Sequence, residues 1–174
     1  MKKVAVALVC LLPLGLQAAK IDTLQVKSPS MNKSIEVVVV SPDVAATKAC
    51  PVIYLLHGYG GNACTWVGIK PDLPKIADEK GIFFVCPDGK NTWYWDSPLN
   101  ADVRYETFIS NELVKYVDSH YKTVADRKGR AITGLSMGGH GAMWNGLRHS
   151  DVFSAAGSTS GGVDIRPFPK NWEM

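Results

Sequence analysis

The sequence predicts an α/β fold, in which a mostly parallel β-sheet carries helices on both faces. Three observations support this. Short β-rich runs alternate with helical runs along most of the chain. Two of those runs, Val52–Leu56 and Ile82–Cys86, are continuously apolar, which is typical of strands buried on both faces. The order strand, helix, strand, helix, strand requires crossover connections between parallel strands. With 46% hydrophobic and 20% charged residues among 174, the composition is that of one ordinary globular domain.

The first half of the chain supplies an antiparallel pair and then the buried strands. Ile21–Lys27 and Ile35–Val40 are predicted strands, joined by a turn that contains a proline and an asparagine. After the strand at 52–56, a helix is predicted over Leu73–Lys80. Pro74 near its start and Gly81 just after its end favour these boundaries.

The second half contains a long loop and two further helices. Residues 87–103 form the loop, which holds Trp93, Tyr94 and Trp95. A helix is predicted from about Arg104 to His120, because apolar residues recur there with helical spacing. The remaining predicted elements are a strand at Arg130–Thr133, a helix at His140–His149 and a strand at Phe153–Thr159.

The first 19 residues have the features of a secretory signal peptide. Lys2 and Lys3 precede an apolar run, Val4–Leu16, and small residues follow for cleavage near Ala18 or Ala19. The 13 residues of that run are too few for a bilayer, which needs about 20. We therefore expect residues 20–174 to be exported to the periplasm or the medium, without a stable membrane anchor.

Charge argues against nucleic acid as the main partner. The formal net charge of +3 falls to +1 once Lys2 and Lys3 leave with the signal peptide. No basic excess then remains to neutralise phosphates.

Three cysteines, Cys50, Cys64 and Cys86, remain in the exported part. Their spacing matches no zinc site, and no metal is expected. Cys50 and Cys86 would lie at opposite ends of parallel strands, too far apart for a disulfide. Cys64 and Cys86 are the pair that could approach each other, and buried free thiols are the alternative.

The pentapeptide Gly134-Leu135-Ser136-Met137-Gly138 is the central motif. G-x-S-x-G alone is a weak signal, but here it follows a predicted strand and opens a predicted helix, as a nucleophile elbow requires. The turn is so tight that the flanking residues must be small, which lifts the serine hydroxyl clear of the backbone. The alternative is a glycine-rich loop with an incidental serine.

A second motif, His57-Gly58-Tyr59-Gly60-Gly61, directly follows the buried strand at 52–56. Acyl transfer places negative charge on the carbonyl oxygen, and two backbone N–H groups aimed at that oxygen stabilise it. In α/β-hydrolases one comes from the residue after the nucleophile, here Met137, and the other from a loop such as this one. Tyr59 is the candidate for the second donor, and a plain turn is the alternative.

The chain resembles the esterase D, feruloyl esterase and antigen 85 mycolyltransferase branch of the α/β-hydrolases. The matching stretches span about residues 50–162: Tyr54–Gly58, Pro87–Gly89, Tyr105–Phe108 and Gly134–Gly139. The resemblance implies that Ser136 is the nucleophile, that the N–H groups of Tyr59 and Met137 form the oxyanion hole, and that no metal or organic cofactor takes part. Members are mostly carboxylester hydrolases, with some acyltransferases.

The same resemblance exposes a gap in the catalytic triad. In this fold the acid and then the histidine follow the serine, many tens of residues later, and only 38 residues follow Ser136. The histidines at 57, 120, 140 and 149 are better interpreted as surface or supporting residues. Asp151 and Asp164 are better interpreted as loop and surface residues. We expect a C-terminally incomplete domain, with the triad acid and histidine beyond residue 174, and a chain that is inactive alone.

Three functions remain open at this point. The first is an exported serine esterase acting on feruloyl, acetyl or other small acyl esters, including esters carried on carbohydrate. The second is an acyltransferase that passes the acyl group to an alcohol. The third is a degenerate hydrolase fold used for binding. The aromatic loop at 93–95 either lines an acyl or aryl pocket or packs against the following helix.

Overall fold

The computed structural model describes residues 19–164, and its centre is one β-sheet. The strands are β1 (Lys20–Ser28), β2 (Lys33–Ser41), β3 (Val52–Leu56), β4 (Phe83–Pro87), β5 (Arg130–Gly134) and β6 (Ala155–Ala156). Within these residues they form a six-stranded sheet in the order β1-β2-β4-β3-β5-β6. β1, β2 and β4 pair antiparallel, whereas β4, β3, β5 and β6 run parallel. The predicted mostly parallel sheet is confirmed.

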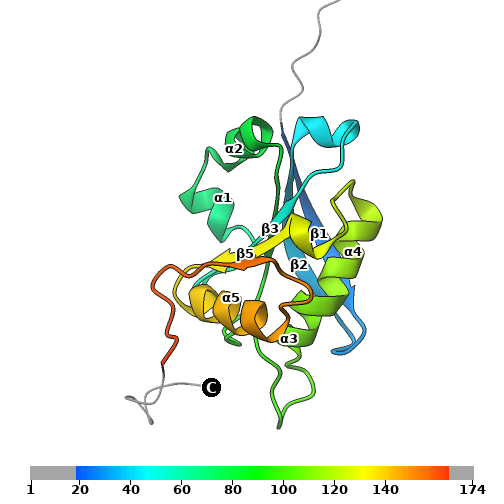
Figure 1. Ribbon diagram of the computed structural model, residues 1–174. Coiled ribbons are helices and arrows are strands. Elements are labelled where there is room, and N and C mark those ends of the chain that lie inside the picture. Colours follow the sequence, from blue (N-terminus) through cyan, green and yellow to red (C-terminus); the bar gives the residue numbers. More distant parts are fainter. Residues whose placement is uncertain (1–18, 165–174) are drawn as a thin grey trace, which may run out of the picture.

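Helices cover both faces of this sheet (Figure 1). The α-helices are α1 (Thr65–Ile69), α2 (Leu73–Lys80), α3 (Tyr105–Thr107), α4 (Val114–His120) and α5 (Met137–Arg148). A π-helix, η2 (Phe108–Leu113), joins α3 to α4, and two short 3-10 turns are η1 (Asp43–Ala46) and η3 (Arg127–Gly129). α1 and α2 lie on one face, and α3, α4 and α5 lie on the other (Figure 1).

The buried side chains of each strand alternate between the two faces of the sheet, and this divides the core into two layers. In β2, Val37 and Val39 belong to the cluster packed under the α3–α5 side, whereas Val38 and Val40 pack with Leu73 of α2. Successive side chains of a strand point to opposite faces, so an unbroken apolar run is what burial on both faces requires.

Most predicted elements agree with the structure to within a residue or two. β3 and α2 have the predicted bounds, and the helical segment at 105–120 buries the predicted face. The π-helical turn within that segment was not predicted. α1 was not predicted either, since it has only five residues.

Two predicted boundaries are wrong. α5 begins at Met137 rather than His140, because the helix starts directly after Ser136. The strand predicted at Phe153–Thr159 shortens to Ala155–Ala156, with one further bridge between Leu135 and Thr159. In the described residues β6 pairs with β5 alone, although the N–H groups of Ser154, Gly157 and Thr159 also donate to β5 carbonyls at 2.9–3.0 Å.

The three cysteines are free thiols in the structure. Cys50 and Cys86 are buried, as the free-thiol alternative requires, whereas Cys64 is exposed and has no disulfide to Cys86. Burial raises the pKa of the Cys86 thiol far above its ordinary value and keeps it uncharged.

The predicted signal peptide lies outside the described residues except for Ala19. In residues 19–164, none of the helices has both the length and the apolar character needed to span a bilayer.

Candidate active site

The site lies at one edge of the sheet, where three loops follow the carboxyl ends of β3, β4 and β5. β3 and β5 are parallel neighbours, with Leu56 paired to Gly134. The Leu135 N–H donates to the Leu56 carbonyl at 3.2 Å, so the loops after both strands start side by side. The carboxyl ends of parallel strands are where open α/β sheets bind ligands.

Ser136 has a strained backbone and an exposed position. Its φ is 54° and its ψ −116°, a conformation that L-residues rarely adopt and that costs of order 1–3 kcal/mol. Two hydrogen bonds hold it: its N–H donates to the Thr159 carbonyl at 2.8 Å, and its carbonyl accepts from the His140 N–H at 3.0 Å. The residue therefore stands as a sharp corner between β5 and α5, as predicted for a nucleophile elbow.

The two glycines of the motif are sterically required. A Cβ placed on Gly138 would lie 2.1 Å from the Leu56 carbonyl oxygen, and one on Gly134 would lie 2.3 Å from the Gly138 carbonyl. Real Cβ atoms essentially never make such contacts with backbone. The tight packing of the corner against β3 explains why small residues flank Ser136.

The glycine-rich loop at 57–61 adjoins this corner. A Cβ on Gly58 would lie 3.3 Å from the Leu135 carbonyl oxygen and 3.5 Å from Ser136 Cβ. The loop is anchored on its far side, because the Gly60 N–H donates to Asn91 Oδ1 at 2.8 Å. The sequence placed both motifs at strand ends, and the structure brings them into contact.

Peptide geometry sets the direction of the two candidate oxyanion donors. The Gly58 carbonyl accepts from His57 Nδ1 at 2.7 Å and from the Gly61 N–H at 3.0 Å. In a trans peptide the C=O and N–H of one unit point in opposite directions, so the Tyr59 N–H points away from those two donors. Met137 is the first residue of α5, and its N–H is one of the helix N-terminal donors without an intrahelical acceptor. Such paired N–H groups can stabilise a developing oxyanion.

His57 is a buried framework residue rather than a surface histidine. Its side chain is 1% exposed, and Nε2 accepts from the Gly89 N–H at 2.9 Å. Because that acceptor role fixes the proton on Nδ1, the Nδ1–H donates to the Gly58 carbonyl. The ring thus ties the loop after β3 to the loop after β4 and uses both nitrogens on backbone groups.

Asp88 adds a fixed negative charge beside this framework. Its carboxylate accepts from Lys90 Nζ at 2.6 Å and from the Lys90 N–H at 2.9 Å. Burial alone would raise the pKa of Asp88, but the hydrogen bonds to its carboxylate outweigh burial and hold that pKa well below its usual range.

The other three histidines bond elsewhere. His140 Nδ1 contacts the Gly162 carbonyl at 2.7 Å, His149 Nε2 contacts Glu106 Oε1 at 2.9 Å, and His120 Nδ1 contacts the Tyr116 carbonyl at 2.9 Å. Within residues 19–164 no histidine ring hydrogen-bonds to Ser136. Asp151 and Asp164 are exposed. The described part of the chain therefore presents no assembled triad.

Glu106 forms a polar centre that the sequence did not reveal. It is 8% exposed and accepts from three side chains of the α5 end, all at 2.7–2.9 Å: Trp144, Arg148 and His149. Burial opposes its charge, but these hydrogen bonds prevail and lower the pKa of Glu106. These hydrogen bonds join α3 to the end of α5, two segments that lie far apart in the sequence.

The aromatic loop packs mainly against α5. Trp93 and Trp95 meet the His140 ring edge-on at 5.3 and 6.1 Å, and Trp95 also meets Trp144 at 5.8 Å. Both tryptophans also line a small cavity of about 200 Å³. The predicted packing of these tryptophans against the following helix is therefore not what these ring contacts show, because His140 and Trp144 belong to α5.

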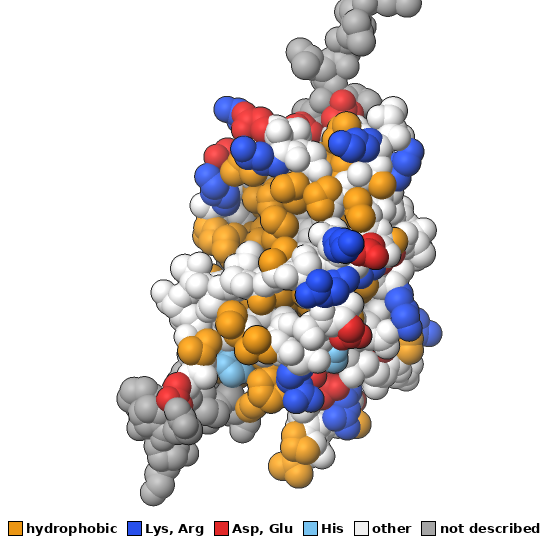
Figure 2. All heavy atoms as spheres, in the orientation of Figure 1, with side chains coloured by type: hydrophobic (Ala, Val, Ile, Leu, Met, Phe, Trp, Pro, Cys, Tyr) orange, Lys and Arg blue, Asp and Glu red, His pale blue; other side chains and the backbone are white. Residues whose placement is uncertain are grey.

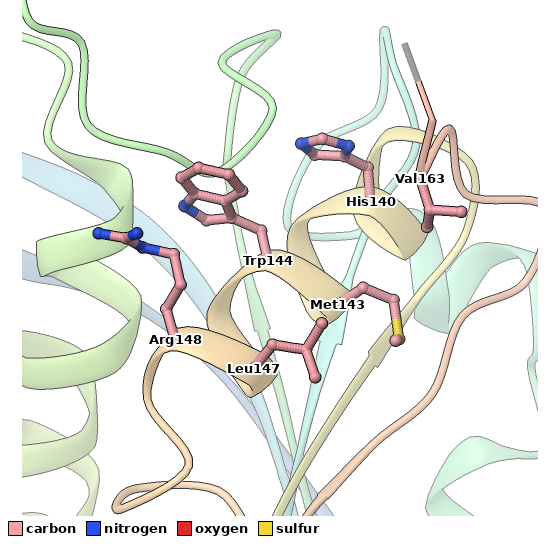
Figure 3. Close-up of a pocket in the computed structure, with 6 residues that line it drawn as sticks. All are labelled: His140, Met143, Trp144, Leu147, Arg148 and Val163. Atoms are coloured by element: carbon pink, nitrogen blue, oxygen red, sulfur yellow. The ribbon is translucent and has the colours of Figure 1, made fainter. Parts of the chain in front are cut away.

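A larger apolar cavity of about 350 Å³ lies along α5 (Figure 3). Its lining residues are His140, Met143, Trp144, Leu147, Arg148 and Val163. Leu147 is 71% exposed and Val163 is 66% exposed, so apolar side chains face solvent here. Among the described residues, no cluster of three or more His, Cys, Asp or Glu side chains is placed to hold a metal ion.

This fold and this corner define the chain as an α/β-hydrolase of the esterase type, which confirms the resemblance drawn from the sequence. The chain belongs to the family described as "Putative esterase", whose model matches residues 28–173.

Named relatives agree with that membership. An esterase of Mycobacterium tuberculosis (strain H37Rv) is 28% identical over 149 residues, which are 82% of this chain and 32% of the relative. The diacylglycerol acyltransferase/mycolyltransferase Ag85A of Mycobacterium leprae is 31% identical over 154 residues, 83% of this chain and 44% of the relative. A solved ferulic acid esterase is 32% identical with a TM-score of 0.68, covering 79% of this chain and 58% of that one. The chain spans less than half of either curated relative.

Proposed function

We propose that the protein is a serine carboxylester hydrolase in which Ser136 is the nucleophile. The observation that carries this proposal is the strained, exposed Ser136 at the start of α5, in contact with the glycine-rich loop at 57–61. Family membership supports it.

The proposed reaction proceeds through an acyl-enzyme on Ser136. Ser136 Oγ attacks the ester carbonyl carbon, and its proton passes to a general base. The N–H groups of Tyr59 and Met137 stabilise the oxyanion that forms. The carbonyl re-forms as the alcohol leaves with a proton, and water then attacks the acyl-enzyme to release the acid and regenerate Ser136.

The general base and its acidic partner lie outside residues 19–164 in this proposal, because every described histidine ring bonds elsewhere. Without a base, a serine hydroxyl keeps its high pKa and is a poor nucleophile at neutral pH. We therefore propose that the 174-residue chain alone turns over esters negligibly.

The proposed substrates are feruloyl, acetyl or other small acyl esters, including esters carried on carbohydrate. Similarity to a ferulic acid esterase supports an aromatic acyl group. The natural protein and its Ser136→Ala variant should be compared on p-nitrophenyl acetate and methyl ferulate. We expect the variant to lose at least ~1000-fold in kcat/KM, and equal rates would refute the role of Ser136.

Acyl transfer to an alcohol is the second candidate, supported by similarity to a mycolyltransferase. The acyl-enzyme is common to both reactions, so the two are separated by the fate of the acyl group. Adding a carbohydrate alcohol during turnover and measuring acylated acceptor against free acid by mass spectrometry separates them. A predominance of free acid supports the hydrolase.

Export to the periplasm or the medium is also part of the proposal. It rests on the amino-terminal sequence alone, where Lys2 and Lys3 precede the apolar run. Amino-terminal sequencing of the mature natural protein should find a new terminus just after Ala18 or Ala19. Retention of the intact terminus in the cell would contradict export.

A further inference from the structure

Tyr94 has an unusual backbone conformation and packs behind the glycine-rich loop at 57–61, here called the oxyanion loop. Its φ is 62°, and that of Trp93 before it is 59°, so two consecutive aromatic residues adopt the left-handed conformation that favours glycine. The Tyr94 side chain is fully buried. A bulky residue keeps such a conformation only where its surroundings impose it.

Two glycines leave the space that the Tyr94 ring fills. A Cβ on Gly89, in the loop after β4, would lie 2.1 Å from Tyr94 Cε1. A Cβ on Gly141, in the second turn of α5, would lie 2.5 Å from Tyr94 Cδ2. The ring therefore lies between the loop that contacts His57 and helix α5, which begins directly after Ser136.

Hydrogen bonds fix the residue at both ends. The Tyr94 hydroxyl donates to the His57 carbonyl at 3.1 Å, and the Tyr94 carbonyl accepts from Asn145 Nδ2 at 3.0 Å. Burial raises the pKa of Tyr94 well above its ordinary value, so the hydroxyl keeps its proton and remains a donor.

These contacts continue to the candidate oxyanion donor. The Tyr94 hydroxyl donates to the His57 carbonyl, and the His57 ring donates to the Gly58 carbonyl. The Gly58 C=O and the Tyr59 N–H belong to the same peptide unit, so the position of this carbonyl sets the direction of the N–H. The ring of Tyr94 also meets the His57 ring edge-on at 5.7 Å. Helix α5 and the oxyanion loop thus share one rigid support.

We propose that Tyr94 is a positioning residue that aligns the Tyr59 N–H with the Met137 N–H at Ser136. This inference rests on the proposed serine hydrolase function. Tyr94 does not touch the substrate in this proposal. It acts through His57, and its loss weakens stabilisation of the transition state rather than binding of the ester.

The test is Tyr94→Phe in the natural protein expressed from its complete reading frame. Phenylalanine keeps the ring in its place and removes only the hydroxyl. Tyr54→Phe is the matched control, since Tyr54 is equally buried in β3, just before the loop, and its hydroxyl has no hydrogen-bond partner in residues 19–164. The measurements are kcat and KM for p-nitrophenyl acetate, inhibition by phenylboronic acid, which forms a tetrahedral adduct on an active serine, and the melting temperature.

We expect Tyr94→Phe to lower kcat by roughly tenfold to a hundredfold with KM changed less than twofold. Boronic acid inhibition should weaken in proportion to kcat/KM, and Tyr54→Phe should match the wild type. A Tyr94→Phe kcat within twofold of wild type, or an equal loss in Tyr54→Phe, overturns the inference while the proposed function stands. A wild-type protein that neither hydrolyses esters nor is inhibited overturns both.

If the Tyr94→Phe variant does not fold, the same kinetic measurements on a Gly141→Ala variant test the inference. The added Cβ displaces the Tyr94 ring, although alanine is the better helix former. A folded Gly141→Ala variant with lowered kcat and unchanged KM supports the inference, and an unchanged kcat overturns it.

Discussion

Ser136 shows how a single residue can be constrained by its neighbours. The energetic cost of its positive-φ backbone conformation is offset by two backbone hydrogen bonds and by the close packing of the elbow on β3. The glycines at 134 and 138 permit that packing because they have no Cβ.

Gly138→Ala should therefore destabilise the protein by at least about 1–3 kcal/mol, since the new Cβ meets the Leu56 backbone, which cannot move aside as a flexible side chain would. Gly68→Ala in α1 is the control, because a Cβ there has nothing within 4 Å. That variant should be neutral or more stable by up to about 1 kcal/mol. Urea unfolding of both measures the difference, and equal stabilities would contradict the packing argument.

The sequence motifs placed three candidate site residues correctly in the fold. Ser136, Tyr59 and Met137 lie at the strand ends where their motifs placed them. His57 was predicted as a surface or supporting residue, but its framework with Tyr94 was not recognised, because the contacts join segments more than 30 residues apart. Gly89 and Gly141 were the sequence features that could have indicated this packing. A glycine alone, however, does not identify the side chain that packs against it.

At the scale of elements, Glu106 connects α3 to α5 through three hydrogen bonds. Because its pKa is lowered in the folded protein, the stabilisation it gives is present above its unfolded value of about 4.3 and is lost as pH falls through the folded value.

Glu106→Gln tests this connection. At pH 7 the variant should be less stable than the wild type by about 1–3 kcal/mol, from lost hydrogen bonds to a charged group. The difference should begin to shrink as pH falls below the unfolded value of about 4.3, and it should be lost once pH has passed through the lowered folded pKa, where the wild-type carboxylate becomes protonated. Glu79→Gln is the control, because Glu79 is more than half exposed and forms a surface ion pair with Lys75 in α2. Unfolding curves from pH 7 to pH 3 in which the difference stays constant would contradict this account.

The predicted boundaries of helices and strands match the structure where a single sequence feature defined them. Glycine and proline bounded α2, and apolar runs defined β3 and β4. The elbow made α5 start three residues earlier than predicted, because Ser136 enters the helix directly from its corner. β6 is shorter than predicted because only Ala155 and Ala156 pair in an unbroken register with β5, and Thr159 forms a separate bridge to Leu135.

At the scale of the whole molecule, the β6 edge is open within the described residues. Ala155 and Ala156 are exposed there. Leu147 of α5 and Ile69 of α1 are also large exposed apolar side chains, at 71% and 56%. Figure 2 shows hydrophobic side chains gathered on this face over α1 and α2, next to β5. Such an edge with apolar flanks favours association.

We predict that the 174-residue chain, made alone, aggregates or dimerises. Leu147→Glu should shift sedimentation toward monomer. Leu99→Glu should not, because Leu99 is 96% exposed on a separate loop. A monodisperse wild-type monomer that melts cooperatively would contradict this prediction.

The most direct test of the central claim is covalent labelling of Ser136. The natural protein, expressed from its complete reading frame, is treated with a fluorophosphonate probe, digested and analysed by mass spectrometry, with Ser136→Ala alongside. We predict one modified peptide, carrying the probe on Ser136, and no labelling of the variant. An unlabelled wild type, or labelling that persists in Ser136→Ala, would contradict the assignment of Ser136 as an activated nucleophile.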